Sequence, residues 1–482
     1  MSIHKSVLSA VSWLSLGNLM ARALSLITMP VLTRYLSPQA YGEAALVSTV
    51  VSLSSVIALA GIDMGYSRHV YSGHLGDSDA VQAFCWRWAL SASAAMACIV
   101  GMIWLIAAYA FGLPRSLAGF AVLGVFASGL TTMAQSRARL ENRYSQLSWV
   151  QFASACTGAA VSLAIAIFWR QDAWALLMAM VVGYAMPALL LGVPSWRALG
   201  SASKLKPDQR WQLLATGLAG VVTAPAYWVL SSSDRWFLAA YHGSEQVGIY
   251  SIGYTVGTVG IVVSTAITGA WLPELARAES ADGESFTTHK SDMTQTLAAL
   301  LMIVSVAIAS AGGDIIRALA DARFYSAGEI VPWLAASVLF YGWLHVGNAL
   351  LVLAGKLHWA ALAWCAALIV SLYLNWKLVP VHGALGAALT QAASFLLVMV
   401  LVWLAALHFE RLRLDWRRLA ASFALSVIVA IIMIPAWAPT AWGSLLLKFP
   451  AGLLYATACL WLLAPNILRS VAHRFRSFRG AV

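Results

Sequence analysis

The chain has 482 residues, of which 61% are hydrophobic and only 10% are charged. Soluble domains carry roughly 25% charged residues, so this composition excludes a water-soluble globule of this size. The formal net charge is +11, which in a soluble protein would favour a nucleic-acid partner. Here the basic residues follow the predicted membrane topology instead, and no nucleic-acid partner is expected.

Apolar stretches of about 20 residues recur along the whole chain, each long enough to cross ~30 Å of hydrocarbon as a helix. Every backbone polar group must be satisfied within such a segment, so the stretches predict helices. We therefore predict an all-α integral membrane protein with about fourteen transmembrane helices. The predicted spans are 8–32, 40–62, 83–108, 116–136, 146–168, 173–196, 212–232, 246–271, 293–312, 328–353, 358–377, 383–408, 419–436 and 441–464.

An internal repeat suggests two lobes. The pattern Leu-x2-Tyr-x6-Gly occurs twice at an offset of 206 residues, as Leu32, Tyr35 and Gly42 and as Leu238, Tyr241 and Gly248. We predict an N-terminal lobe (1–200) and a C-terminal lobe (201–410), each of six spans, related by a pseudo-two-fold axis normal to the membrane. Residues 411–482 would add two further spans and a basic cytoplasmic tail.

The orientation follows from the loops, because cytoplasmic loops retain Lys and Arg. With both termini inside, twenty of the 30 basic residues fall on the cytoplasmic side. Seven fall on the opposite side: Arg34, Arg115, Arg170, Arg235, Arg317, Arg323 and Lys377. The sequence therefore predicts that both termini are cytoplasmic.

No cofactor or metal site is expected. The five cysteines are scattered singly, without metal-site or redox spacing, at Cys85, Cys98, Cys156, Cys365 and Cys459. The sequence contains no Walker A motif, so we do not expect the chain to hydrolyse ATP.

Three segments carry a family resemblance. Residues 234–241, running on through 248–251, resemble the signature between the seventh and eighth spans of the polysaccharide transporter family. Residues 30–42 are similar to that family's first hairpin, and residues 61–68 to the end of its second span. These proteins are Wzx-type O-antigen and exopolysaccharide flippases of the MOP superfamily, related to MATE exporters and lipid II flippases.

The resemblance implies a MATE-like two-lobed bundle that flips an undecaprenyl-pyrophosphate-linked oligosaccharide to the outer leaflet by alternating access. The oligosaccharide would be a repeat unit of O-antigen, as in lipopolysaccharide biosynthesis, or of an exopolysaccharide. Such a protein is a transporter in the bacterial inner membrane, not an enzyme. An ion gradient or membrane potential would drive it, and its partners would be membrane lipids, a polysaccharide polymerase and the chain-length machinery.

Arg22 is the main candidate for substrate binding. It lies near the middle of the first span, where an arginine costs at least ~2.5–3.5 kcal/mol, so it is expected to face a cavity or a partner. Four residues earlier, Asn18 shares its helix face. Arg22 would meet the substrate's pyrophosphate, or it would pair structurally with a carboxylate or a helix end. Arg87, between two tryptophans, is a weaker candidate that could instead extend to the interface.

Further candidates have comparable structural explanations. Glu43 follows a predicted N-cap, Ser37, and would serve either the helix dipole or ion coupling. Asp234 is a second coupling candidate, and the resemblance makes its neighbour Arg235 a cavity candidate. His345 and Asn348 lie on one helix face and would bind sugar or hydrogen-bond a neighbouring helix.

Two other functions remain open at this level. A MATE-like exporter of drugs or small molecules would share the fold, but a cationic drug would favour acidic cavity residues over Arg22. A membrane-embedded glycan polymerase or glycosyltransferase would need a large external loop or clustered acidic residues, and neither is visible. The charge of the cavity lining separates the two transport functions.

The topology is testable by cysteine labelling. Single cysteines at His473 and within 201–209 should react only with reagents that reach the cytoplasm, and cysteines within 312–327 only from the other side. The physical reason is the charge asymmetry of the loops. Labelling of 201–209 from outside would contradict the predicted orientation.

Overall fold

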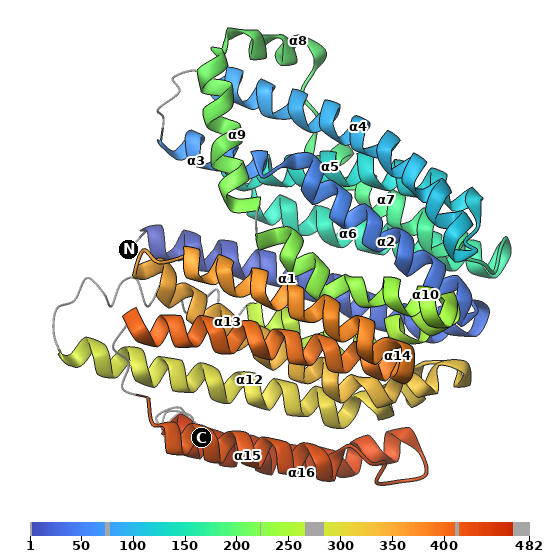
Figure 1. The fold of residues 1–482 in the computed structure, drawn as a ribbon, viewed down its shortest axis with the longest axis vertical. Coiled ribbons are helices and arrows are strands. Elements are labelled where there is room, and N and C mark those ends of the chain that lie inside the picture. The colour runs from blue at the N-terminus through green and yellow to red at the C-terminus, as the bar shows by residue number, and fades with distance from the viewer. Residues whose placement is uncertain (1, 73–77, 222, 266–283, 410–413, 466–482) are drawn as a thin grey trace, which may run out of the picture. The chain divides into compact units, whose positions relative to one another are not determined.

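The computed structural model describes residues 2–72, 78–221, 223–265, 284–409 and 414–465, and these ranges are helical without any strand (Figure 1). Eleven of the described helices are long and apolar enough to cross a membrane. The helix α1 (Ser2–Tyr35) is not among the eleven, and it carries two polar residues, Asn18 and Arg22, near its middle. The predicted all-helical membrane fold is confirmed.

The described helices pack as two compact units. Unit 1 comprises Met1–Ser251 and Asn375–Ala384. Its helices begin with α1 and continue with α2 (Pro38–Leu59), α3 (Ile62–Ser72), α4 (Ser78–Phe111), η1 (Arg115–Leu117), α5 (Ala118–Leu140), α6 (Tyr144–Phe168), α7 (Trp174–Leu191), α8 (Trp196–Leu199), η2 (Gly200–Lys204), α9 (Pro207–Val221) and most of α10 (Thr223–Gly257). Within this unit α1 packs on α6, whereas α4 packs on α5 and α2.

Unit 2 comprises Ile252–Leu374 and Leu385–Val482. Its helices are α12 (Glu284–Leu319), η3 (Ala322–Ile330), α13 (Val331–Leu353), most of α14 (His358–Phe409), α15 (Trp416–Met433) and α16 (Ala441–Leu463). The helices α15 and α16 lie side by side and both pack on α12 (Figure 1). The predicted lobe boundaries at 200 and 410 were placed from the sequence repeat, whereas the two units are defined by contacts between helices. The lobe boundaries therefore stay a prediction.

Two of the long helices contain a sharp break at a glycine. In α10 Gly243 has φ 78°, and in α14 Gly383 has φ 53°, backbone angles that side chains disfavour. Each break separates two predicted spans, 212–232 from 246–271 and 358–377 from 383–408. The chain thus turns back into the bilayer at a single residue where the sequence predicted a short loop.

The seventh predicted span, 212–232, differs from the described helices. Its first part lies on α9, which is described up to Val221, and the membrane-spanning stretch starts at Pro225 in α10. Apolar residues continue through both segments, so composition does not separate them. α9 lies against α3, and a Cβ on Gly217 would come within 2.5 Å of the Gly61 carbonyl oxygen.

The start of α2 follows from its sequence. Ser37 is the N-cap residue, and its side-chain oxygen accepts a hydrogen bond of 3.2 Å from the Ala40 amide. Pro38 occupies the first helical position, where its missing N–H costs no intrahelical hydrogen bond. The predicted cap is confirmed.

The two glycines of the repeat meet each other. A Cβ on Gly42 would lie 1.7 Å from the Ser244 carbonyl oxygen, and a Cβ on Gly248 would lie 1.8 Å from the Pro38 carbonyl oxygen. Pro38 and Ser244 are themselves related by the 206-residue offset. The contact is therefore reciprocal, with the start of α2 and the second half of α10 in backbone contact.

We predict that Gly42→Ala and Gly248→Ala each destabilise the protein strongly. The added methyl group meets rigid backbone, so α2 and α10 have to separate; overpacking of this kind costs about 1–3 kcal/mol or more. The measurement is protein abundance in the membrane and thermal unfolding of the purified protein. Gly183→Ala in α7 is the matched control, because a Cβ there meets nothing within 4 Å and alanine favours a helix. Equal stability of all three variants would contradict the proposed contact.

Candidate functional site

A buried carboxylate lies in the first half of α10. Asp234 is 1% exposed, and its carboxylate accepts hydrogen bonds from the Tyr250 hydroxyl and, at 2.8 Å, from the Arg235 amide. Arg235 is also buried; its Nη1 donates to the Ser231 carbonyl at 3.3 Å, and its guanidinium lies 5.8 Å from the Tyr250 ring centroid. Two opposite charges and a tyrosine thus form one compact cluster on both sides of the Gly243 break.

Two tryptophans join this part of α10 to α2. The Trp228 indole donates to the Thr49 carbonyl at 3.0 Å and to the Ser52 hydroxyl at 2.9 Å. The Trp236 indole donates to the Thr49 hydroxyl at 3.0 Å. Both indole N–H groups lie on the α2 side of α10, so the Asp234 cluster is held in a fixed place relative to α2.

Glu43 is a second buried carboxylate of unit 1. It is 7% exposed and accepts a hydrogen bond of 2.9 Å from the Gln39 amide, one turn earlier on α2. It follows Gly42 directly and therefore lies at the crossing of α2 and α10. The N-cap expected before it is present, but the helix dipole does not explain why this carboxylate is buried rather than exposed.

Arg22 is half-buried in α1. Within the part of the chain that the structure describes, its guanidinium has no hydrogen bond and no ion pair; only its backbone carbonyl is engaged, by the Ser25 hydroxyl. Asn18 lies outside the residues whose side chains are described. The structural alternative, an arginine paired with a carboxylate, is therefore not seen among the described residues.

His345 and Asn348 share one face of α13 in unit 2, as predicted. The His345 ring lies edge-on to Tyr341 with 4.5 Å between ring centroids. Among the described residues, His345 Nε2 and Asn348 Oδ1 are buried without a hydrogen-bond partner. Buried polar atoms without partners are uncommon in proteins, so both atoms remain available to a ligand or to water.

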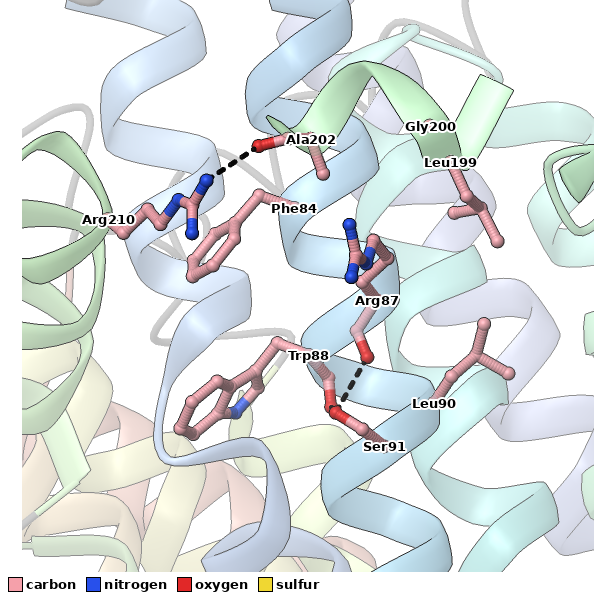
Figure 2. A pocket seen from close by; sticks show the side chains of 9 residues that line it. All are labelled: Phe84, Arg87, Trp88, Leu90, Ser91, Leu199, Gly200, Ala202 and Arg210. Atoms are coloured by element: carbon pink, nitrogen blue, oxygen red, sulfur yellow. Dashed lines mark hydrogen bonds between the residues drawn. The ribbon is translucent and has the colours of Figure 1, made fainter. Parts of the chain in front are cut away.

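Arg87 belongs to α4 of unit 1. It lines a pocket of about 740 Å³ near the start of α4, together with residues of α8, η2 and α9 (Figure 2). α4 packs on α5 and α2, whereas Arg22 belongs to α1, which packs on α6. The two predicted arginines thus lie on helices with different main packing partners.

One buried ion pair was missed by the sequence analysis. In unit 2, Lys448 Nζ of α16 lies 2.6 Å from Asp314 Oδ2 of α12, and both side chains are almost fully buried. Lys448 also donates to the Ser310 carbonyl at 2.9 Å, and the Ser444 hydroxyl donates to Asp314 at 2.8 Å. A lysine inside an apolar stretch was the available signal, but its partner is 134 residues away.

No group of three or more His, Cys, Asp or Glu side chains among the described residues is placed to hold a metal ion. The described residues instead offer, in unit 1, buried carboxylates with polar partners and a half-buried arginine without a described partner, and, in unit 2, buried polar atoms without a described partner. Such groups inside a membrane bundle are typical of a transport pathway.

Solved structures of two transporter classes share this fold. The lipid II flippase MurJ in an inward closed conformation matches with a TM-score of 0.66 and 13% identity, over 95% of this chain and 99% of that chain. A Vibrio cholerae MATE transporter, VcmN, matches with a TM-score of 0.58 and 12% identity, over 84% and 97% of the respective chains. A multidrug resistance MATE transporter of the MOP superfamily in an inward-facing conformation matches with a TM-score of 0.55 and 12% identity, over 86% and 98%.

These likenesses define the fold: the chain is a multi-helix membrane protein that folds like MurJ and like MATE transporters. Residues 31–326 match the model of the polysaccharide biosynthesis protein family. The chain belongs to this family. No curated protein matches it. The resemblance seen in three segments of the sequence is confirmed.

We predict that the protein loses stability when one partner of the buried pair Lys448–Asp314 is removed, but loses little when both are replaced by apolar residues. Lys448→Met leaves a buried carboxylate and should cost about 3–5 kcal/mol, whereas Lys448→Met combined with Asp314→Leu should restore most of the loss. The measurement is a double-mutant cycle on thermal unfolding in detergent. Arg418→Met, which breaks an exposed pair with Asp415, is the control and should cost under about 1 kcal/mol. Additive losses would argue against coupling.

Proposed function

We propose that the protein flips an undecaprenyl-pyrophosphate-linked oligosaccharide, a repeat unit of O-antigen or an exopolysaccharide, from the cytoplasmic to the outer leaflet of the bacterial inner membrane. Alternating access would move the charged head group while the polyprenyl tail stays in the lipid. The observation that carries the proposal is Arg22, a half-buried arginine on a membrane helix without a described partner.

An unpaired arginine suits a phosphate ligand. The planar guanidinium offers donors in a fork that matches two phosphate oxygens, and it is cationic at physiological pH. Hydrogen bonds to charged groups contribute about 1.5–3 kcal/mol each, and more charge attraction is available where water is scarce. A pyrophosphate bound to Arg22 would offset the cost of keeping this residue in the bilayer.

The second half of the proposal concerns coupling to an ion gradient or to the membrane potential. Asp234 and Glu43 are buried carboxylates on the two helices that touch at Gly42 and Gly248. Binding or release of a cation at either carboxylate would change the charge buried beside that contact. Arg235 already has partners within α10, so we assign it to holding Asp234 rather than to the substrate.

The same fold supports a second candidate, export of small cationic molecules, and the buried carboxylates Asp234 and Glu43 favour it. The family and Arg22 favour an anionic, lipid-linked substrate instead. His345 and Asn348, with their unpaired atoms, would hydrogen-bond sugar hydroxyl groups in the flippase. A polysaccharide polymerase and the chain-length machinery would take up the product on the outer side.

We predict that Arg22→Ala abolishes polymer export in a flippase-deficient strain, with a loss of at least about tenfold in transport rate, because the phosphate loses its charged donor. Arg22→Lys should restore part of the activity, since it keeps the charge but loses the fork. The measurement is surface polymer per unit of membrane-inserted protein.

Arg115→Ala is the control, because Arg115 is exposed at the end of a span and has no described partner. It should leave export unchanged. Full activity of Arg22→Ala at normal abundance would refute Arg22 as the substrate's partner. Drug resistance conferred by the wild-type protein, without polymer export in the flippase-deficient strain, would favour the small-molecule exporter.

A further inference from the structure

The pocket near the start of α4 has no role in the proposed transport path. It lies between α4, the α8–η2 segment and α9, all within unit 1, and has a volume of about 740 Å³ (Figure 2). Its lining residues are Phe84, Arg87, Trp88, Leu90 and Ser91 of α4, Leu199, Gly200 and Ala202 of the α8–η2 segment, and Arg210 of α9. Two of these residues are basic and none is acidic.

One of the two arginines is fixed by the fold. Arg210 Nε donates to the Leu205 carbonyl at 3.0 Å, and Nη2 lies 3.5 Å from the carbonyl oxygens of Ala202 and Ser203. Its guanidinium also lies 6.0 Å from the centroid of the Phe84 ring. These partners are all neutral, so they orient the guanidinium without neutralising its charge.

The other arginine is available. Arg87 is exposed, and within the described residues its guanidinium makes no hydrogen bond or ion pair; only its carbonyl accepts from Ser91. In Figure 2 Phe84 lies between the two arginine side chains, which border the same pocket. Among the described residues, the pocket therefore combines one oriented cation and one cation without a partner with aromatic and apolar walls.

The length of the apolar part of α4 indicates where the pocket lies relative to the membrane. From Trp88 to Phe111 the helix has no charged residue, a stretch of about 35 Å that covers the ~30 Å hydrocarbon layer. Arg87 is the charged residue that borders this stretch, and Trp88 is of the type that lies at the membrane interface. This stretch puts Arg87 at its edge, the depth at which lipid phosphates are expected; Arg210 borders the same pocket, and Leu90 lies within the apolar stretch.

We propose that this pocket binds an anionic glycerophospholipid, with the phosphodiester between Arg87 and Arg210 and the start of an acyl chain along Trp88 and Leu90. A basic pocket beside membrane helices at head-group level fits this chemistry, because an anionic lipid has a net negative charge and a zwitterionic lipid has none. Such a lipid would connect α4 to the segment that leads into α10, the helix of Asp234.

The test uses the full-length purified protein, freed of lipid in detergent and titrated with dioleoylphosphatidylglycerol while bound lipids are counted by native mass spectrometry. Arg87→Gln should weaken the first binding step at least about fivefold, because each arginine near a membrane surface contributes that much to attraction of anionic lipid. Ser91→Glu, which adds a carboxylate to the same pocket, should weaken it similarly. Dioleoylphosphatidylcholine should bind all forms equally and so reports intact folding.

Arg417→Gln is the matched control: Arg417 is exposed at the start of α15, has no described partner and lines no described pocket. It should change phosphatidylglycerol binding less than twofold. Equal binding by wild type, Arg87→Gln and Ser91→Glu would overturn the proposal, and so would an equal loss in Arg417→Gln. Displacement of the lipid by millimolar inorganic phosphate would assign the pocket to a soluble anion. Preferential, Arg87-dependent binding of farnesyl phosphate would assign it to the polyprenyl carrier.

Discussion

Backbone contact between α2 and α10 at Gly42 and Gly248 organises unit 1. Because neither residue has a side chain, the two helices come close enough for the indoles of Trp228 and Trp236 to reach Thr49. Those hydrogen bonds fix the rotation of α10 about its axis, and that rotation places Asp234 inside the protein rather than against lipid. The burial of these carboxylates therefore depends on Gly42 and Gly248 having no side chain.

Patterns along the chain predicted the helices well, because hydrocarbon permits few alternatives for a long apolar segment. The N-cap at Ser37 was also predicted correctly, since a cap is a local signal. Contacts between helices that are distant in the sequence could not be predicted. The pairing of Lys448 with Asp314 and the approach of Arg210 to Phe84 depend on which helices touch. Periodicity says which residues share a helix face but not what that face meets.

Three charged residues differ in how their charge is compensated inside the protein. Asp234 is surrounded by donors from its own helix, and Lys448 is neutralised by a carboxylate of another helix. Arg22 has neither arrangement within the described residues. A fully satisfied charge has little to gain from a ligand, whereas an unsatisfied one gains its missing partner on binding. This contrast, rather than the presence of charge alone, distinguishes Arg22 as a binding candidate.

The pair formed by Lys448 and Asp314 has a consequence for biosynthesis. Asp314 leaves the ribosome 134 residues before Lys448, which at 5–20 residues per second is roughly 7–27 s. During that interval α12 holds a carboxylate whose permanent partner does not yet exist. The packing of α12 therefore cannot be completed until α16 has been synthesised and has brought Lys448 to Asp314.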